Sequence, residues 1–138
     1  MSRVRNFDKM NNRIGYASNM KMNEDTYKLR REVINFIYEA KTHVALPRIE
    51  VRITEPNKGS HSGVLGLAYL NEKVIYIPSN LIENGRLKTY FREVVAHEIV
   101  HAVTGFEHDE KCPLMSATIG SKPMTDEQLW SHFKGYFK

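Results

Sequence analysis

Three histidines and two glutamates fall close together in the stretch VVAHEIVHAVTGFEH, residues 94–108. His97 and His101 are four residues apart, and Glu98 directly follows the first of them. In an α-helix, residues at this spacing share a face with their Cα atoms ~6 Å apart along the axis, so both imidazoles can reach one ion. Neutral histidine nitrogens are zinc ligands, and an adjacent glutamate can take a proton from a zinc-activated water. The spacing therefore predicts a zinc site with Glu98 as general base.

A third protein ligand is needed, because catalytic zinc sites keep three such ligands and leave one position for water. On an unbroken helix, His108 would lie about 16 Å beyond His97 and could not share an ion with it. The helix must therefore end between them, and Gly105 permits the turn because glycine adopts positive φ without strain. We predict His108 as the third ligand, with Glu107 and Asp109 as alternatives, because histidine suits zinc better here.

The other histidines and the single cysteine are predicted to be surface or packing residues. His43, His61 and His132 each stand alone in the sequence, although His61 lies in the loop GSHSG and could approach the site. Cys112 has no second cysteine to pair with, and free cysteines are most often small buried residues. An ordinary buried helix with stray histidines remains the alternative to a metal site, and it predicts that no zinc binds.

Helices with one apolar face are expected to position these residues. The periodicity predicts them at residues 24–43, 87–104 and 124–137. Asn23 or Asp25 would cap the first helix, and Thr125 would cap the last, with Gln128 three residues later.

Strands are expected between the first two helices. The segment IEVRIT (49–54) alternates apolar and polar residues, and the runs GVLGLAYL (63–70) and KVIYIP (73–78) are β-like. The order of helix, strands, long helix, irregular loop and helix predicts an α+β fold.

Length and charge indicate one globular domain with a basic lead. The chain has 138 residues and a net charge of +4. Residues 1–31 hold eight Lys or Arg against three Asp or Glu, a balance of +5, so the basic character is local. We expect a flexible lead at 1–23 and a single catalytic domain at 24–138. No signal peptide or membrane-spanning run is recognisable, which predicts a soluble, monomeric protein that is intracellular or released by a non-Sec route.

The segments HEIVHAVTGFEH and CPLMS together resemble the metzincin clan of zinc endopeptidases, especially its small matrixin-like and snapalysin-like members. Their pattern is H-E-x-x-H-x-x-G-x-x-H followed by a turn that contains methionine. The likeness covers about residues 49–138, because LGLAYLNEKVIYIP resembles the strand pair before the active-site helix and MTDEQLWSHFKGYF the C-terminal helix. One departure is that three residues separate His101 from Gly105, where the pattern has two.

The resemblance implies a zincin-like fold, in which a twisted mixed β-sheet carries a backing helix, an active-site helix and a C-terminal helix. It implies three zinc ligands: His97, His101 and His108. It assigns Glu98 as general base and Met115 to a hydrophobic floor beneath the metal. An edge strand would pair with an extended substrate, and its implied residues are Gly66, Leu67, Ala68 and Tyr69. Residues after Met115, SATIGSKP, would wall the pocket for the side chain that follows the cleaved bond.

These observations predict a zinc-dependent endopeptidase that acts on peptide or protein substrates. One alternative is a non-catalytic zinc-binding interaction domain, in which the metal organises the loop from 105 to 115. Another is a peptidase that its basic N-terminus tethers to nucleic acid.

Overall fold

The structure is a computed structural model that describes residues 22–55, 66–117 and 122–137. Residues 1–21 of the predicted lead at 1–23, His61 and the first three residues of the predicted strand 63–70 lie outside the described residues. Along the chain the elements are α1 (Glu24–Ala40), β1 (Glu50–Thr54), β2 (Leu67–Ala68), β3 (Val74–Pro78), the 3-10 turn η3 (Ser79–Leu81), β4 (Ile82–Glu83), β5 (Arg86–Leu87), α2 (Phe91–Thr104) and α3 (Asp126–Gly135). The fold is α+β, as the sequence predicts.

Helix α1 begins at a capping box formed by Asn23 and Thr26. The Thr26 backbone amide donates to Asn23 Oδ1 (3.0 Å), and the Asn23 backbone amide donates to Thr26 Oγ1 (2.6 Å). Both bonds satisfy amides that the first helical turn leaves without intrahelical acceptors. The helix ends at Ala40, three residues before the predicted end, and its buried face packs on β1, η3 and β4.

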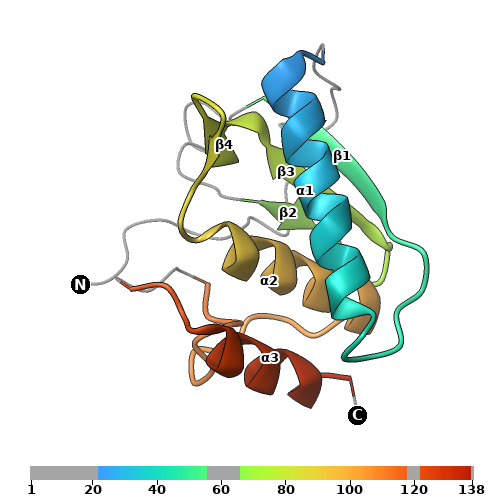
Figure 1. Ribbon diagram of the computed structural model, residues 1–138. Helices are drawn as coiled ribbons and strands as arrows, with labels where there is room; N and C mark the ends of the chain where they lie inside the picture. Colours follow the sequence, from blue (N-terminus) through green and yellow to red (C-terminus); the bar gives the residue numbers. More distant parts are fainter. Residues whose placement is uncertain (1–21, 56–65, 118–121, 138) are drawn as a thin grey trace.

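A three-stranded mixed sheet in the order β1-β3-β2 lies beside α1 (Figure 1). Strands β1 and β3 run parallel, with Glu50 opposite Val74, and β2 pairs antiparallel with β3, with Leu67 opposite Tyr76. Within the described residues, β2 is an edge of this sheet and is shorter than the predicted strand. Helix α2 packs against β2 and β3, so the sheet places its edge strand next to the histidine-bearing helix.

A β-hairpin that the helical periodicity does not predict precedes α2. Strands β4 and β5 pair with Ile82 opposite Leu87, and the turn between them has positive φ at Asn84 (54°) and Gly85 (76°). The predicted helix start at Leu87 is therefore wrong, because this residue belongs to a strand and α2 begins at Phe91. Lys28 Nζ donates to the Gly85 carbonyl (2.6 Å), which ties the hairpin to α1.

Helix α2 is buried on nearly every side and ends where predicted. Its C-cap is Gly105, with φ 77°, and the Gly105 amide donates to the His101 carbonyl (3.2 Å). The turn between β2 and β3 covers the same helix end, since the amides of Asn71 and Lys73 donate to the carbonyls of His101 and Ala102 (3.1 Å each). These bonds satisfy carbonyls of the last turn and fix the point at which the chain leaves the helix.

Helix α3 lies across the other side of α2 (Figure 1). Its N-terminus is the predicted capping box, in which the Gln128 amide donates to Thr125 Oγ1 and the Thr125 amide to Gln128 Oε1 (3.1 Å each). Its buried side chains are Leu129, Trp130 and Phe133. Among the helices of the described residues, none combines the length and hydropathy that crossing a membrane requires.

Candidate metal centre

Three histidines converge at the C-terminal half of α2. His97 and His101 project from the helix and are fully buried, and half-buried His108 comes from the loop after Gly105. One ring nitrogen from each lies within 4.8 Å of the others, an arrangement that could hold a metal ion. The structure therefore brings together the three residues that the spacing predicts as ligands.

The two alternative third ligands have other environments. Glu107 is exposed, and Asp109 Oδ1 accepts a hydrogen bond from the Lys111 amide (2.9 Å). Neither belongs to the group of ligand atoms that His108 completes. The geometry therefore favours His108 over both carboxylates.

Backbone carbonyls fix the orientation of both helical imidazoles. His97 Nδ1 lies 2.7 Å from the Leu114 carbonyl oxygen, and His101 Nδ1 lies 2.6 Å from that of Phe106. A carbonyl oxygen only accepts, so each Nδ1 must carry the proton, which leaves the lone pair of a neutral ring on Nε2. Such a second partner is typical of metal-binding histidines, because it sets both tautomer and ring direction.

The two Nε2 atoms face each other at a distance that suits a shared ion. They lie 3.1 Å apart. Two nitrogen ligands of a tetrahedral ion at ~2.0–2.1 Å are roughly 3.3–3.4 Å from each other, close to this value. Two lone pairs at this separation repel unless a cation lies between them, so the donor set fits a metal ion.

The chain reaches His108 by turning back directly after α2. The helix stays regular through Thr104, whose Oγ1 donates to the Val100 carbonyl (2.6 Å), and Gly105 then takes the left-handed conformation. The next residue, Phe106, already supplies the acceptor for the His101 ring. The extra residue between His101 and Gly105 is thus accommodated within α2, and the turn after it still presents His108 to the other two rings.

Glu98, the predicted general base, is fully buried on α2 beside Gly66. A Cβ atom at position 66 would lie 3.1 Å from both Cγ and Oε2 of Glu98, and 3.1 Å from Val94 Cγ1. Contacts this short are tighter than nearly all real Cβ contacts, so the backbone before β2 is in close contact with this carboxylate. Besides its predicted place along the substrate strand, Gly66 leaves room for the Glu98 side chain, because glycine has no Cβ atom.

Met115 lies in a compact turn that follows the third histidine. Both it and Leu114 are fully buried. The Asp109 amide donates to the Met115 carbonyl (2.9 Å), and the Ser116 amide donates to the Cys112 carbonyl (2.9 Å). Because the Leu114 carbonyl in the same turn holds the His97 ring, the turn directly supports one member of the histidine cluster.

The predicted edge strand is buried where the structure describes it. All four proposed substrate residues, Gly66, Leu67, Ala68 and Tyr69, are buried. The Tyr69 ring packs edge-on against Tyr76 of β3, with 6.0 Å between centroids. Residues 118–121, within the predicted pocket wall SATIGSKP, lie outside the described residues.

Four other ligand-type residues among those described do not belong to the group that the three histidines form. Exposed His43 stacks on Trp130 with 4.1 Å between centroids, and Cys112 Sγ lies 3.9 Å from His132 Nδ1. Glu93 is a buried carboxylate that the motif does not single out. Its position four residues before His97, on the histidine-bearing face of the helix, is the sequence signal that could have identified it.

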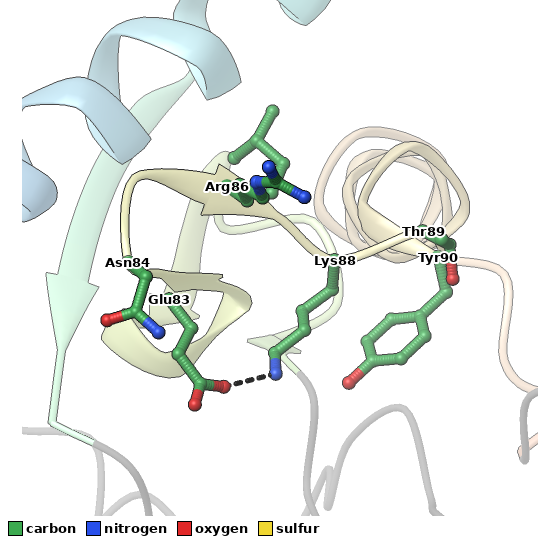
Figure 2. A pocket seen from close by; sticks show the side chains of 7 residues that line it. Glu83, Asn84, Arg86, Lys88, Thr89 and Tyr90 are labelled. Atoms are coloured by element: carbon green, nitrogen blue, oxygen red, sulfur yellow. Dashed lines mark hydrogen bonds and ion pairs between the residues drawn. The ribbon is translucent and has the colours of Figure 1, made fainter.

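A hollow of about 670 Å³ lies at the β4–β5 hairpin and the start of α2. Figure 2 shows Lys88 extending toward Glu83 across this hollow, and their Nζ and Oε1 atoms form an ion pair at 2.6 Å. Its lining contains none of the three histidines. This hollow and the histidine cluster therefore lie at different places in the described part of the chain.

Comparison with known proteins does not assign this chain to a family, because no family model matches the sequence and no curated protein is significantly similar to it.

Proposed function

We propose that this protein is a zinc-dependent endopeptidase with a metzincin-like centre. The observation that carries the proposal is the pair of Nε2 atoms of His97 and His101, 3.1 Å apart and aimed by backbone carbonyls, next to the buried carboxylate of Glu98. Imidazole nitrogens suit zinc, and with His108 they would make three protein ligands. A carboxylate beside such a set argues against a purely structural zinc site, which usually has four protein ligands.

The proposed reaction is hydrolysis of a peptide bond with Glu98 as general base. Zinc in this site would supply Lewis-acid chemistry, because it polarises a carbonyl oxygen and lowers the pKa of a water towards ~7. Glu98 would take a proton from the attacking water and return it to the leaving amine. Its burial supports this role, since the electrostatic interactions of a carboxylate are stronger inside the protein than in bulk water.

We place the substrate along β2. This strand is an edge of the mixed sheet among the described residues, and it packs against α2. An extended peptide would add to it through main-chain hydrogen bonds, beside the backbone from Gly66 to Tyr69. The short distances between position 66 and Glu98 support this placement, because a peptide there would lie near the proposed base. Met115 would form part of the apolar floor.

Metal analysis combined with a protease assay tests the proposal. We expect one zinc per chain and cleavage of casein or a peptide library, with activity that stops on chelation and returns with zinc. His101→Ala should lose zinc and activity together, whereas His43→Ala, outside the cluster, should keep both. Bound zinc without hydrolysis would instead indicate a non-catalytic zinc-binding domain. A chain that binds no zinc would indicate an ordinary helix with stray histidines.

A further inference from the structure

Glu93 is a buried carboxylate that the proposed reaction does not use. It lies in the first turn of α2 with 5% of its surface exposed. The Met124 backbone amide hydrogen-bonds to the carboxylate, but Oε2 is buried without a hydrogen-bond partner. Burial raises the pKa of this carboxyl, and the Met124 amide opposes the shift. A buried polar oxygen without a partner lowers stability, so this arrangement needs a physical explanation.

The position of Glu93 relates it to the metal centre. It precedes His97 by four residues, which places both side chains on one face of α2, one turn or ~6 Å apart. His97 contacts the Leu114 carbonyl and Glu93 contacts the Met124 amide, so both side chains point toward backbone that follows α2 in the sequence. Glu98 is about 100° around the helix from His97 in the other direction. Glu93 thus flanks the centre on the side away from the proposed base.

The negative charge of Glu93 is not explained by its contact with Met124. Among the described residues no basic side chain forms an ion pair with it, and its neighbour Arg92 pairs instead with Glu39 (2.8 Å) and Asp126 (3.2 Å). The hydrogen bond from the Met124 amide needs only one acceptor oxygen, and this oxygen need not be charged. The neutral side chain of a glutamine would supply such an oxygen as well. The second oxygen and the charge indicate a cationic partner from outside the described residues.

We propose that Glu93 is a specificity residue that binds the side chain of a lysine or arginine next to the cleaved bond. This inference rests on the proposed peptidase function. Both side chains have long flexible stems, so a substrate held at the histidines could reach one helical turn along α2. The cation would give Oε2 a partner, whereas an apolar side chain would leave it unpaired and an acidic one would be repelled. The predicted substrates are therefore peptides with a basic residue beside the scissile bond.

Paired peptide substrates test this specificity. Zinc-loaded protein would be assayed with peptides that differ only in carrying Lys, Arg, Leu or Glu beside the cleaved bond. We expect kcat/KM to be at least about ten-fold higher for the basic peptides than for the leucine peptide. Glu93→Gln keeps an acceptor for the Met124 amide and removes the charge. It should lose this preference, because kcat/KM for the basic peptides should fall toward the value for the leucine peptide.

Peptide binding gives a readout that does not depend on turnover. Zinc-loaded Glu98→Gln protein should bind the lysine peptide about ten-fold more tightly than the leucine peptide, and adding Glu93→Gln should remove the difference. Cleavage with the same preference in wild type and Glu93→Gln overturns the role of Glu93 and leaves the peptidase intact. If no peptide is cleaved, the proposed peptidase function is wrong. If the Glu98→Gln protein binds both peptides equally, the proposed role of Glu93 is wrong, whatever the cleavage assay shows.

A graded series of substrates tests the contact with wild-type protein alone, so its result does not depend on whether Glu93→Gln folds. Wild-type protein would be assayed with diaminobutyrate, ornithine and lysine peptides, which extend one ammonium group by successive methylenes. We expect kcat/KM to rise along the series as the charge approaches Glu93. A flat series would contradict the contact.

Discussion

At the scale of single residues, the candidate centre depends on where two imidazole rings are aimed. The spacing of His97 and His101 predicts that both can reach one ion, because helical geometry relates them. It cannot predict the carbonyls of Leu114 and Phe106 that fix their tautomers, because these belong to loop residues without periodic pattern. The three histidines of the cluster were therefore predictable, whereas the hydrogen-bond partners of His97 and His101 required the structure.

Replacing Gly66 tests how closely the backbone packs on the proposed base. Gly66→Ala would place a methyl group 3.1 Å from the Glu98 carboxylate, so the side chain must shift by a few tenths of an ångström. We expect kcat to fall roughly ten- to a hundred-fold with zinc content unchanged, since small misplacements at a reacting centre are costly. Gly135→Ala is the matched control, because its Cβ would have no neighbour within 4 Å, and it should keep full activity. Unchanged kcat in Gly66→Ala would contradict the positioning effect.

At the scale of elements, the end of α2 determines whether the third histidine joins the other two. Gly105 combines a positive φ of 77° with a close approach to Asn71, whose Nδ2 would lie 2.4 Å from a Cβ at this position. The same β2–β3 turn donates the Asn71 amide to the His101 carbonyl. The turn before β3 and the helix end are therefore packed together, and this contact could not be read from the motif.

Gly105→Ala is expected to destabilise the protein and weaken zinc binding. Left-handed φ costs a non-glycine residue about 1–2 kcal/mol, and displacement of Asn71 adds to this. Gly85→Ala measures the effect of the positive φ alone, because Gly85 has φ 76° but a Cβ added there would meet no atom within 4 Å. Urea unfolding should show a larger loss for Gly105→Ala than for Gly85→Ala, and only the former should lower zinc affinity. Equal losses would mean that the contact with Asn71 contributes nothing.

Arg92 connects all three helices through charge and ring contacts. Its guanidinium donates two hydrogen bonds to Glu39 of α1 (2.9 and 2.8 Å) and lies 5.0 Å from the Phe36 ring centroid and 5.8 Å from that of Trp130. Its Nε lies 3.2 Å from Asp126 Oδ1 at the start of α3. This cluster holds α1 and α3 against the helix that carries the proposed site.

The contact with Arg92 predicts a defined pH dependence of stability. Hydrogen bonds from Arg92 lower the pKa of Glu39 below its ordinary value of 4.5, although partial burial opposes the shift. A lowered carboxyl pKa stabilises the fold above pH 4.5 and loses this contribution as pH falls through the lowered value. Wild type should therefore unfold at higher urea concentration than Glu39→Gln at pH 6, and the difference should shrink on acidification below 4.5. A difference that grows with acid would contradict this.

The exposed pair Glu83–Lys88 provides a comparison for Glu39. Lys88 also lowers the pKa of Glu83, but this carboxylate is open to solvent, where salt screens the interaction. Glu83→Gln should therefore change stability less than Glu39→Gln, and the change should fade further in high salt.

At the scale of the whole molecule, the α+β class and three helices were predictable, but the hairpin before α2 was not. Apolar periodicity and capping residues identify α1 and α3, since local sequence determines both. Asn84-Gly85 is a strong two-residue turn signal. However, the apolar spacing from Leu87 onwards continues into α2 and suggests one longer helix. Tethering of the basic lead to nucleic acid stays a prediction, because residues 1–21 lie outside the described part.

Zinc is expected to stabilise the fold as a whole, because the ligands come from both α2 and the loop that follows it. A ligand that binds only the folded state adds about 2.7 kcal/mol at a hundred times its Kd. For a chain of this length, Tm should rise by roughly 10 °C. His101→Ala should abolish this rise. His43→Ala should lower the Tm of the zinc-free protein, because His43 stacks on Trp130, but the rise on adding zinc should stay the same. A zinc response that survives His101→Ala would contradict the assignment.

The most direct test of the peptidase is hydrolysis by wild type and Glu98→Gln at equal zinc content. The substitution keeps the size of the side chain and removes its ability to take a proton from water. We predict one zinc per chain in both proteins, peptide cleavage by wild type, and a loss of kcat of at least about a thousand-fold in Glu98→Gln. Full turnover by the zinc-loaded variant would contradict the proposal that Glu98 is the general base of a zinc peptidase.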